Sequence, residues 1–311
     1  MSKKLVASIV TATVMASVVA YYSLSMVNTP TVTITVSGAS ALYPLIVEWA
    51  SAYQNVTPGV LIDVSAGGAG KGMTDVLNGL ADIGMISREI YPNETVAGAV
   101  YVAVTKDCVV ATINKNNPVL KNVLTKGITK QMFYNIFIVG NVTNWGQVIG
   151  RPDIANKIDV FTRSDSCGAG DTWAKYLGNK KQTNLLGTGV SGDPGVLEAV
   201  KADPNAIGYN NIGYAYDMQT KEQVDGIAVV PIDINGNGQV DQSENFYGNK
   251  TDIVNAILQG VYPSPPARNL YLVTKNAFTG ATEKFVKWIL TDGQQYVDTA
   301  GYVHLPQDIL D

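Results

Sequence analysis

The segment from Arg163 to Trp173 brings a guanidinium, small polar residues and glycines together, in the order Arg-Ser-Asp-Ser-Cys-Gly-Ala-Gly-Asp-Thr-Trp. Alternating apolar residues at 158–161 predict a strand before this loop, and residues 171–178 predict a short helix after it. The unpaired N–H groups of a first helical turn, the helix dipole and the planar fork of Arg163 together favour a phosphate or a similar oxyanion. The alternative is a loop that only caps its helix.

Two segments nearer the N-terminus have the same order of strand, polar loop and helix. Residues 32–36 and 60–64 predict strands, and the loops 37–40 and 67–72 follow them directly. The second loop, Gly-Gly-Ala-Gly-Lys-Gly, looks at first like a nucleotide-binding P-loop. It lacks the first Gly of that motif and the Ser or Thr after the Lys, so we exclude an NTPase.

A third apolar strand is predicted at 81–86, and it leads directly into Ser87 and Arg88. Taken alone, this is an ordinary strand end with a solvated arginine. Together with the two helix N-termini and the Arg163 loop, it would place N–H donors, hydroxyls and two guanidinium groups around one small anion. The sequence therefore predicts an anion-binding site assembled from separate loops.

Composition limits the class of protein. The chain has 311 residues, of which 46% are hydrophobic and 15% are charged, which is enough for two globular lobes with full cores. The net charge is −4, and no Lys/Arg cluster is interleaved with aromatic residues, so nucleic acid is not expected as a partner. An anionic ligand must therefore be attracted by local charge.

The N-terminus has the layout of an export signal. Lys3 and Lys4 precede an uncharged apolar stretch from 5 to 27. This stretch is also long enough to span a bilayer as a helix. Residues 1–28 are therefore predicted to be a signal peptide or an N-terminal membrane anchor, which places the protein outside the cytoplasm, either released or held on the outer face of the membrane.

Residues 233–244, Asp-Ile-Asn-Gly-Asn-Gly-Gln-Val-Asp-Gln-Ser-Glu, have the spacing of a twelve-residue calcium loop. The predicted Ca²⁺ ligands are Asp233, Asn235, Asn237, Gln239 through its backbone carbonyl, Asp241 and Glu244. The alternative is a turn rich in Asn and Gly. Because a strand and not a helix precedes the loop, we expect a structural ion and not a calcium sensor.

Several segments resemble the solute-binding protein of the ABC phosphate importer, a type II periplasmic binding protein. The similar segments are Gly-Ala-Ser-Ala-Leu-Tyr-Pro at 38–44, the glycine-rich loop 67–73, Asp-Ile-Gly-Met-Ile-Ser-Arg-Glu at 82–89, Ile-Phe at 136–137 with Gly-Asn-Val-Thr-Asn-Trp at 140–145, and the Arg163 loop. The resemblance covers nearly the whole exported part, and the Thr-Asn-Trp signature is its most specific element.

The resemblance implies an α/β fold with two lobes, two crossover segments and a ligand in the cleft between the lobes. We place the crossings near 101–105 and after 230. The first lobe then comprises residues 30–103 and 231–311, including the calcium loop, and the second lobe comprises residues 104–230. The ligand contacts implied by position are Ser40, Ala41, Leu42, Gly70, Ser87, Arg88, Arg163, Asp165, Cys167, Gly168 and Ala169. Several of these contacts must be made by backbone N–H groups.

The chain departs from the family at three hydroxyl positions. Ala69, Cys167 and Ala169 stand where the family has Ser, Ser and Thr, and each lost hydrogen bond to a charged ligand costs on the order of 1.5 to 3 kcal/mol if nothing replaces it. Phosphate near neutral pH carries a proton and sulfate does not, so phosphate selectivity needs a carboxylate acceptor. Asp165 and Asp171 are the candidates, with helix capping as their alternative role. Another tetrahedral oxyanion, namely sulfate, molybdate or tungstate, is the alternative ligand.

The resemblance implies a monomeric, non-catalytic protein that captures inorganic phosphate and delivers it to the permease subunits of an ABC importer. An enzyme is the alternative, with Cys167 as a low-pKa nucleophile next to Arg163 and a helix N-terminus. The sequence offers no evident base for it, since the only histidine is His304. Cys108 and Cys167 either form a disulfide, which export permits, or remain two buried thiols.

Overall fold

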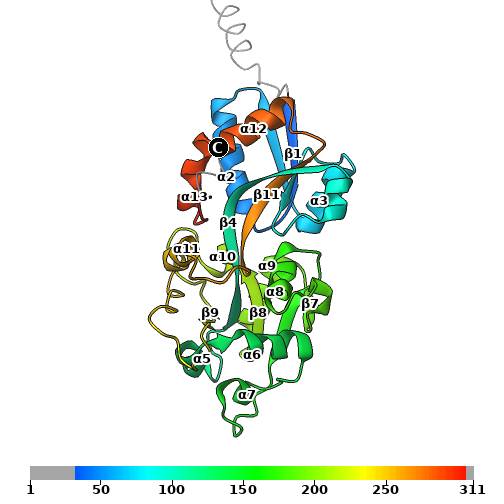
Figure 1. Cartoon of the computed structure of the whole chain (residues 1–311). Coiled ribbons are helices and arrows are strands. Elements are labelled where there is room, and N and C mark those ends of the chain that lie inside the picture. The colour runs from blue at the N-terminus through cyan, green and yellow to red at the C-terminus, as the bar shows by residue number, and fades with distance from the viewer. Residues whose placement is uncertain (1–31, 306–311) are drawn as a thin grey trace, which may run out of the picture.

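Two hydrophobic cores organise the part of the chain that the computed structural model describes, residues 32–305. The two lobes built on these cores stand one above the other and are joined by long strands (Figure 1). The predicted signal peptide or anchor at residues 1–28 lies outside the described residues. Within residues 32–305, no helix has both the length and the apolar character needed to cross a membrane.

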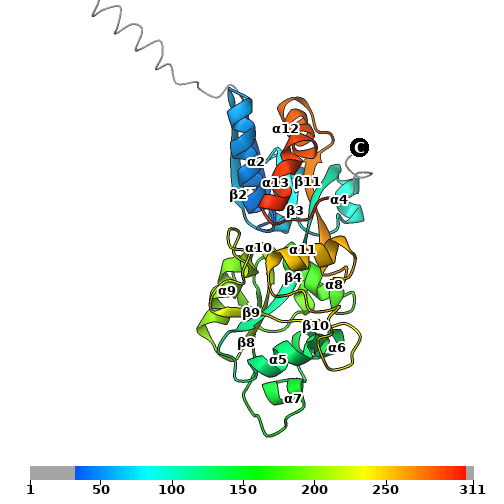
Figure 2. The same cartoon turned by 90° about the vertical axis from the view of Figure 1, so that its left-hand side faces the viewer.

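Three parallel strands form the centre of the first lobe. β1 (Val32–Gly38) pairs with β2 (Val60–Ala66) on one side and with β3 (Ile83–Ile86) on the other. Parallel neighbours need crossover connections, and two helices with apolar faces supply them. The helices of this lobe are α2 (Tyr43–Val56), α3 (Ala69–Leu77), α4 (Pro92–Val96), α12 (Gly280–Leu290), a 3-10 turn (Asp292–Gln294) and α13 (Gln295–Thr299). Figure 2 shows α2, α12 and α13 grouped in this lobe.

Two long antiparallel strands pass from one lobe to the other. β4 (Ala99–Asn114) pairs with β11 (Ala267–Lys275) along nearly the whole length of β11, with a shift of register between Leu270 and Tyr271. Val104 and Leu270 belong to the first core, whereas Cys108 and Ala267 belong to the second. Both strands therefore cross between the lobes, and they make the sheet continuous through the molecule.

The second lobe adds β8 to β4 and then extends the sheet in the order β4-β8-β6-β7, with β9 also on β4. Its strands are β5 (Ile128–Thr129), β6 (Asp159–Arg163), β7 (Thr188–Val190), β8 (Ala206–Asn211), β9 (Ile227–Val229) and β10 (Ile232–Asp233). Its helices are α5 (Leu120–Lys126), α6 (Lys130–Tyr134), a π-helical turn (Asn135–Val139), α7 (Trp145–Ile149), α8 (Gly168–Tyr176), a 3-10 turn (Gln182–Asn184), α9 (Gly192–Ala202), α10 (Ile212–Ala215) and α11 (Lys250–Leu258).

The second crossing differs from the sequence-based expectation. Residues 231–266 were expected in the first lobe, but Phe246, Tyr247 and Tyr262 are buried in the second core, and β10 pairs with β5 of the second lobe. The chain crosses back only at β11. The sequence shows that β9 ends near residue 230, but the packing of these aromatic residues decides which lobe the next segment joins. The loop 233–244 is therefore part of the second lobe.

Candidate functional site

Glycines bring the predicted loops of the two lobes into direct contact. A Cβ atom on Gly168, at the start of α8, would lie 2.2 Å from both the carbonyl oxygen and Oγ of Ser87, which follows β3. A Cβ atom on Gly70, in the first turn of α3, would lie 2.4 Å from Oγ of Ser166. Neither position has room for a side chain unless the neighbour moves. The structure thus holds the lobes closed, with Gly70, Ser87 and Gly168 at their junction.

Unpaired hydrogen-bond donors gather on the loops of this junction. The N–H groups of Gly168 and Ala169 have no acceptor among the described residues, which is usual for the first turn of a helix. Within the same described part of the chain, the N–H groups of Ser40 and Ala41 before α2 and the hydroxyl of Ser87 also lack a partner. Donors of this kind, on loops from both lobes, favour a small anion.

The turn before α2 uses one of the predicted donors for itself. The N–H of Leu42 donates to the carbonyl of Ala39 at 3.1 Å, and the N–H of Ala39 donates to the carbonyl of Met85 at 2.8 Å. These bonds hold the turn beside the end of β3. Leu42 therefore stays a predicted contact whose N–H is already used by the turn that leaves Ser40 and Ala41 unpaired.

The guanidinium of Arg163 is buried and already holds two carboxylates. Its Nε donates to Oδ1 of Asp165 at 2.8 Å, and a terminal nitrogen donates to Oδ2 of Asp193 at 2.6 Å. Asp193 is fully buried and also accepts the N–H and the amide of Asn211, at 2.8 and 2.7 Å. Burial by itself lowers the pKa of Arg163, but the two carboxylates raise it above its ordinary value. Arg163 therefore remains charged, and its charge is compensated within the protein.

Asp193 was not predicted as a site residue. It stands in the first turn of α9, where an acidic residue is common because it complements the helix dipole. Only the three-dimensional contact with Arg163 distinguishes it from an ordinary capping residue, so no local signal was available.

The carboxylate of Asp165 faces the first lobe. Its Oδ2 would lie 3.3 Å from a Cβ atom on Gly68, the residue before α3. Burial alone raises the pKa of Asp165, but the hydrogen bonds from Arg163 and from a backbone N–H lower it below its ordinary value. Asp165 is therefore an ionised acceptor at the junction at neutral pH.

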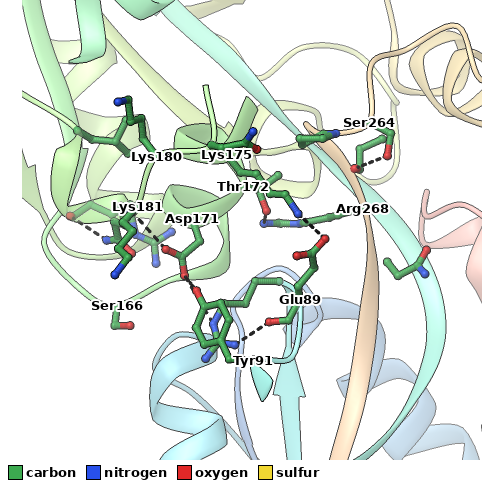
Figure 3. Close-up of a pocket in the computed structure, with 18 of the residues that line it drawn as sticks. Glu89, Tyr91, Ser166, Asp171, Thr172, Lys175, Lys180, Lys181, Ser264 and Arg268 are labelled. Carbon is green, nitrogen blue, oxygen red and sulfur yellow. Dashed lines mark hydrogen bonds and ion pairs between the residues drawn. The ribbon is translucent and has the colours of Figure 1, made fainter. Parts of the chain in front are cut away.

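The other candidate acceptor, Asp171, lies elsewhere. It accepts the hydroxyl of Tyr91 at 3.1 Å, a contact that joins the second lobe to the first (Figure 3). A second contact between the lobes joins Lys175 to Glu89. The four residues of these two contacts line the cavity between the lobes that is described below, and the contacts hold the lobes together there.

Arg88 is paired with Glu94 of the first lobe, and its Nε also lies 3.6 Å from Oδ2 of Asp171 in the second lobe. Its two terminal nitrogens donate to the two carboxylate oxygens of Glu94 at 2.9 and 2.7 Å, and its guanidinium lies 4.1 Å from the centre of the Tyr91 ring. Burial lowers the pKa of Arg88, but the carboxylate of Glu94 raises it overall. Because its guanidinium is occupied in this way, Arg88 has fewer free hydrogen-bond donors for an anion than the sequence suggested. Glu94 was not predicted, since its only sequence signal is its place in the first turn of α4.

A cavity of about 1460 Å³ opens between the lobes and borders the junction through Arg163 and Ser166 (Figure 3). Its basic lining residues are Arg88, Lys106, Arg163, Lys175, Lys180, Lys181 and Arg268, against two acidic ones, Glu89 and Asp171. The chain as a whole has a net charge of −4. Arg88, Arg163, Lys175 and Arg268 are paired with carboxylates, so the positive potential that an anion needs to approach this acidic protein comes mainly from Lys106, Lys180 and Lys181.

Both cysteines are free and buried, so the alternative of two separate thiols holds in this structure. The Sγ of Cys167 accepts the N–H of Gly170 at 3.3 Å and caps α8. Burial raises the pKa of the Cys167 thiol to about 12, despite the nearby Arg163. The hypothesis of a low-pKa nucleophile at Cys167 is therefore wrong.

Comparison with known families establishes the class of this two-lobed chain. A family model described as PBP superfamily domain matches residues 26–293. The chain belongs to the PBP superfamily. This membership confirms the resemblance to solute-binding proteins that the loops predicted.

Named relatives of this PBP superfamily chain are phosphate-binding proteins. The phosphate-binding protein PstS of Methanocaldococcus jannaschii is 26% identical over 329 residues, covering 90% of this chain and 84% of that protein. The phosphate-binding protein PstS of Bacillus subtilis is 26% identical over 274 residues, covering 87% of this chain and 80% of that protein.

Solved structures similar to this PBP superfamily chain support its fold. A putative phosphate ABC transporter substrate-binding protein with bound phosphate, from Clostridium perfringens, has a TM-score of 0.70 and 24% identity, covering 88% of this chain and 100% of that chain. An ABC-type phosphate transport receptor from Vibrio cholerae has a TM-score of 0.62 and 20% identity, covering 88% of this chain and 100% of that chain. The predicted two-lobed type II periplasmic-binding-protein fold is confirmed.

The loop 233–244 of this PBP superfamily chain is built around two buried acids. Asp233 accepts the N–H groups of Gly236 at 2.7 Å and Gly238 at 3.0 Å. Glu244 accepts the N–H groups of residues 234, 235 and 241. Asp241 accepts the amide groups of residues 235, 237 and 239. In this conformation, no three His, Cys, Asp or Glu side chains within the described residues are arranged to hold a metal.

Proposed function

We propose that this chain is an extracytoplasmic solute-binding protein that captures inorganic phosphate between its lobes for an ABC importer. The observation that carries the proposal is the junction at which Gly168 meets Ser87, since unpaired N–H and hydroxyl donors from both lobes surround it. Donors fixed on both lobes bind an anion best when the lobes are closed, so the anion favours closure. The names of the relatives support phosphate as the ligand.

Asp165 supports phosphate over sulfate. Because Arg163 is compensated by Asp165 and Asp193, the junction binds through dipoles and hydroxyl groups, with an ionised carboxylate beside them. A fully deprotonated sulfate would be repelled by that carboxylate, whereas a protonated phosphate donates a hydrogen bond to it. Asp171 is engaged by Tyr91 and is the weaker candidate for this role.

The remaining parts of the proposal concern setting and partners. The protein acts without catalysis and as a monomer, because one chain supplies both sides of the junction. It passes phosphate to the permease subunits of the importer. The N-terminal segment directs export as a signal peptide or holds the protein on the outer face of the membrane as an anchor.

Calorimetric titration of the purified full chain with phosphate, and separately with sulfate at the same pH, tests the proposal. We expect binding of phosphate and no binding of sulfate. Asp165→Asn should weaken phosphate binding and reduce the discrimination against sulfate, because the acceptor loses its charge. Asp153→Asn is the matched control, since Asp153 is exposed and pairs only with Arg151.

Two outcomes would contradict the proposal. Heat of binding with sulfate and none with phosphate would mean that the site is correct but binds another tetrahedral oxyanion. The hydroxyls missing at Ala69, Cys167 and Ala169 would then explain the changed ligand. Binding of neither anion by a folded chain would remove the site assignment itself.

A further inference from the structure

The loop 233–244 takes no part in the proposed phosphate site, yet it combines features that call for a cation. It has oxygen-bearing side chains at positions one, three, five, nine and twelve, Gly238 at position six and a backbone carbonyl at position seven. This matches the spacing by which a twelve-residue loop surrounds Ca²⁺.

A second observation, independent of the spacing, is the burial of two carboxylates without a cationic partner. Asp233 and Glu244 are each only 3% exposed. No Lys, Arg or His among residues 32–305 forms an ion pair with either of them. Buried carboxylates are expensive unless they are paired with a cation or ligate a metal, and the backbone N–H groups of the loop supply no net charge. The two acids, hydrogen-bonded to backbone N–H groups, therefore hold a net negative charge inside the second lobe that a bound cation would balance.

The rest of the loop is open to solvent, so an ion can enter it. Asn235 and Asn237 are exposed, and their amide groups donate to Asp241 at 2.7 and 2.8 Å. In this structure the amide groups of Asn235 and Asn237 therefore contact the carboxylate of Asp241, which in a calcium loop would face the cation. Rotation of these exposed side chains would exchange the amide donors for an ion and present oxygen atoms in their place.

The attachment of the loop indicates what the ion would do. The N–H of Val240 donates to the carbonyl of Thr125 at 2.8 Å, at the end of α5, and β10 pairs with β5 just before the loop. Phe246 and Tyr247 enter the second core directly after it. An ion in the loop would therefore fasten residues 231–247 to the second lobe.

From these observations we propose that residues 233–244 bind one Ca²⁺ ion as a structural element of the second lobe. Asp233, Asn235, Asn237, Asp241 and Glu244 supply side-chain oxygens, and Gln239 supplies its carbonyl. Ca²⁺ accepts roughly six to eight oxygen ligands, whereas Mg²⁺ demands a stricter octahedron and keeps its waters, so Ca²⁺ is the ion expected.

The test is calorimetric titration of the chelator-treated full chain with CaCl₂ and with MgCl₂, together with the melting temperature in each ion. We expect one Ca²⁺ bound, a higher melting temperature in Ca²⁺, and a much weaker effect of Mg²⁺. Glu244→Gln removes a charged ligand and should weaken Ca²⁺ binding by more than about tenfold. Asn237→Ala should also weaken Ca²⁺ binding. It changes an exposed position and leaves both buried acids in place, so it serves as the test if Glu244→Gln fails to fold.

Ser243→Ala is the matched control, because Ser243 lies in the same loop at a position that provides no ligand. It should bind Ca²⁺ as the parent chain does. Absence of Ca²⁺ binding by the folded chain, or parent-like binding by both Glu244→Gln and Asn237→Ala, would overturn the proposal. Equal binding of Mg²⁺ and Ca²⁺ would overturn the assignment of the ion.

Discussion

Arg268 on β11 and Asp107 on β4 form a buried, two-pronged ion pair at the place where both strands pass between the lobes. The two nitrogens donate to the two carboxylate oxygens at 2.8 and 3.1 Å. Arg268 also donates to the side chain of Asn211, which in turn holds Asp193, the partner of Arg163. A continuous set of polar contacts thus links the crossing strands to Arg163 at the proposed anion site.

Arg268→Gln should lower both the free energy of unfolding and the affinity for phosphate. It leaves Asp107 buried without a cation, and breaking a buried pair in this way costs roughly 3 to 5 kcal/mol. The affinity falls because Asn211 and Asp193 lose a fixed neighbour and hold Arg163 less firmly. Urea denaturation and phosphate titration measure the two effects. Arg151→Gln, which removes an exposed ion pair, is the control, and an Arg268→Gln protein with parent-like stability and affinity would disprove the coupling.

Gly168→Ala should block closure without harming either lobe. The added Cβ would lie 2.2 Å from Ser87, yet alanine favours the helical conformation of α8. We expect phosphate affinity to fall by more than about 100-fold, which corresponds to roughly 3 kcal/mol, while the melting temperature without phosphate changes little. In Gly248→Ala, the matched control, the new Cβ meets nothing within 4 Å. Unchanged phosphate binding by Gly168→Ala would mean that the lobes do not close through this contact.

The loops of the junction were predictable because their signals are local. A strand that ends in small polar residues and a following helix specify an N-terminus with free N–H groups, whatever surrounds it. For that reason local patterns located the loops 37–40 and 163–173 and the strand end at Ser87, and the family resemblance then singled out Ser40 and Gly168 within the loops. The structure places these segments on facing loops of the two lobes.

What the sequence did not predict depends on contacts between distant residues. Glu94 and Asp193 neutralise Arg88 and Arg163, but each looks like an ordinary acidic residue in a first helical turn. The lobe boundary depends on which core accepts the aromatic residues after the 233–244 loop. Hydrophobicity predicts that Phe246 is buried, but not the core in which it is buried.

Arg163 pairs with both Asp165 and Asp193, so variants of these residues should affect the free energy of unfolding and the affinity for phosphate differently. Arg163→Ala should weaken phosphate binding, because Asp165 and Asp193 then stand beside the junction without the cation that compensates them. It should also reduce the free energy of unfolding by roughly 3 to 5 kcal/mol, because Asp193 becomes an unpaired buried charge. Adding Asp193→Asn removes that charge and should restore part of the stability without restoring binding. Urea denaturation and phosphate titration of the single and double variants test this. A double variant no more stable than Arg163→Ala would show that Asp193 is not the source of the cost.

Lys250 is a buried lysine without a carboxylate partner among residues 32–305, and it lies where the lobes meet. It is 1% exposed, and its Nζ donates to the carbonyl of Ala300 at 3.2 Å, near the ring of Tyr302. Burial lowers its pKa to about 8 from an ordinary value of 10.5, with repulsion from Lys221 adding to the effect.

Stability should therefore rise with pH between about 8 and 10.5, because the unfolded chain holds the Lys250 proton more tightly than the folded chain does. Below about pH 8 the burial cost is fully present, at roughly 3 kcal/mol for a shift of this size. Lys250→Met removes the titrating group, so it should raise the free energy of unfolding at pH 7 and flatten the rise above pH 8. Urea denaturation at pH 7 and pH 9.5 measures both effects, with Lys284→Met as the exposed control. A variant less stable than the parent chain at pH 7 would show that the bond to Ala300 outweighs the cost of burying the charge.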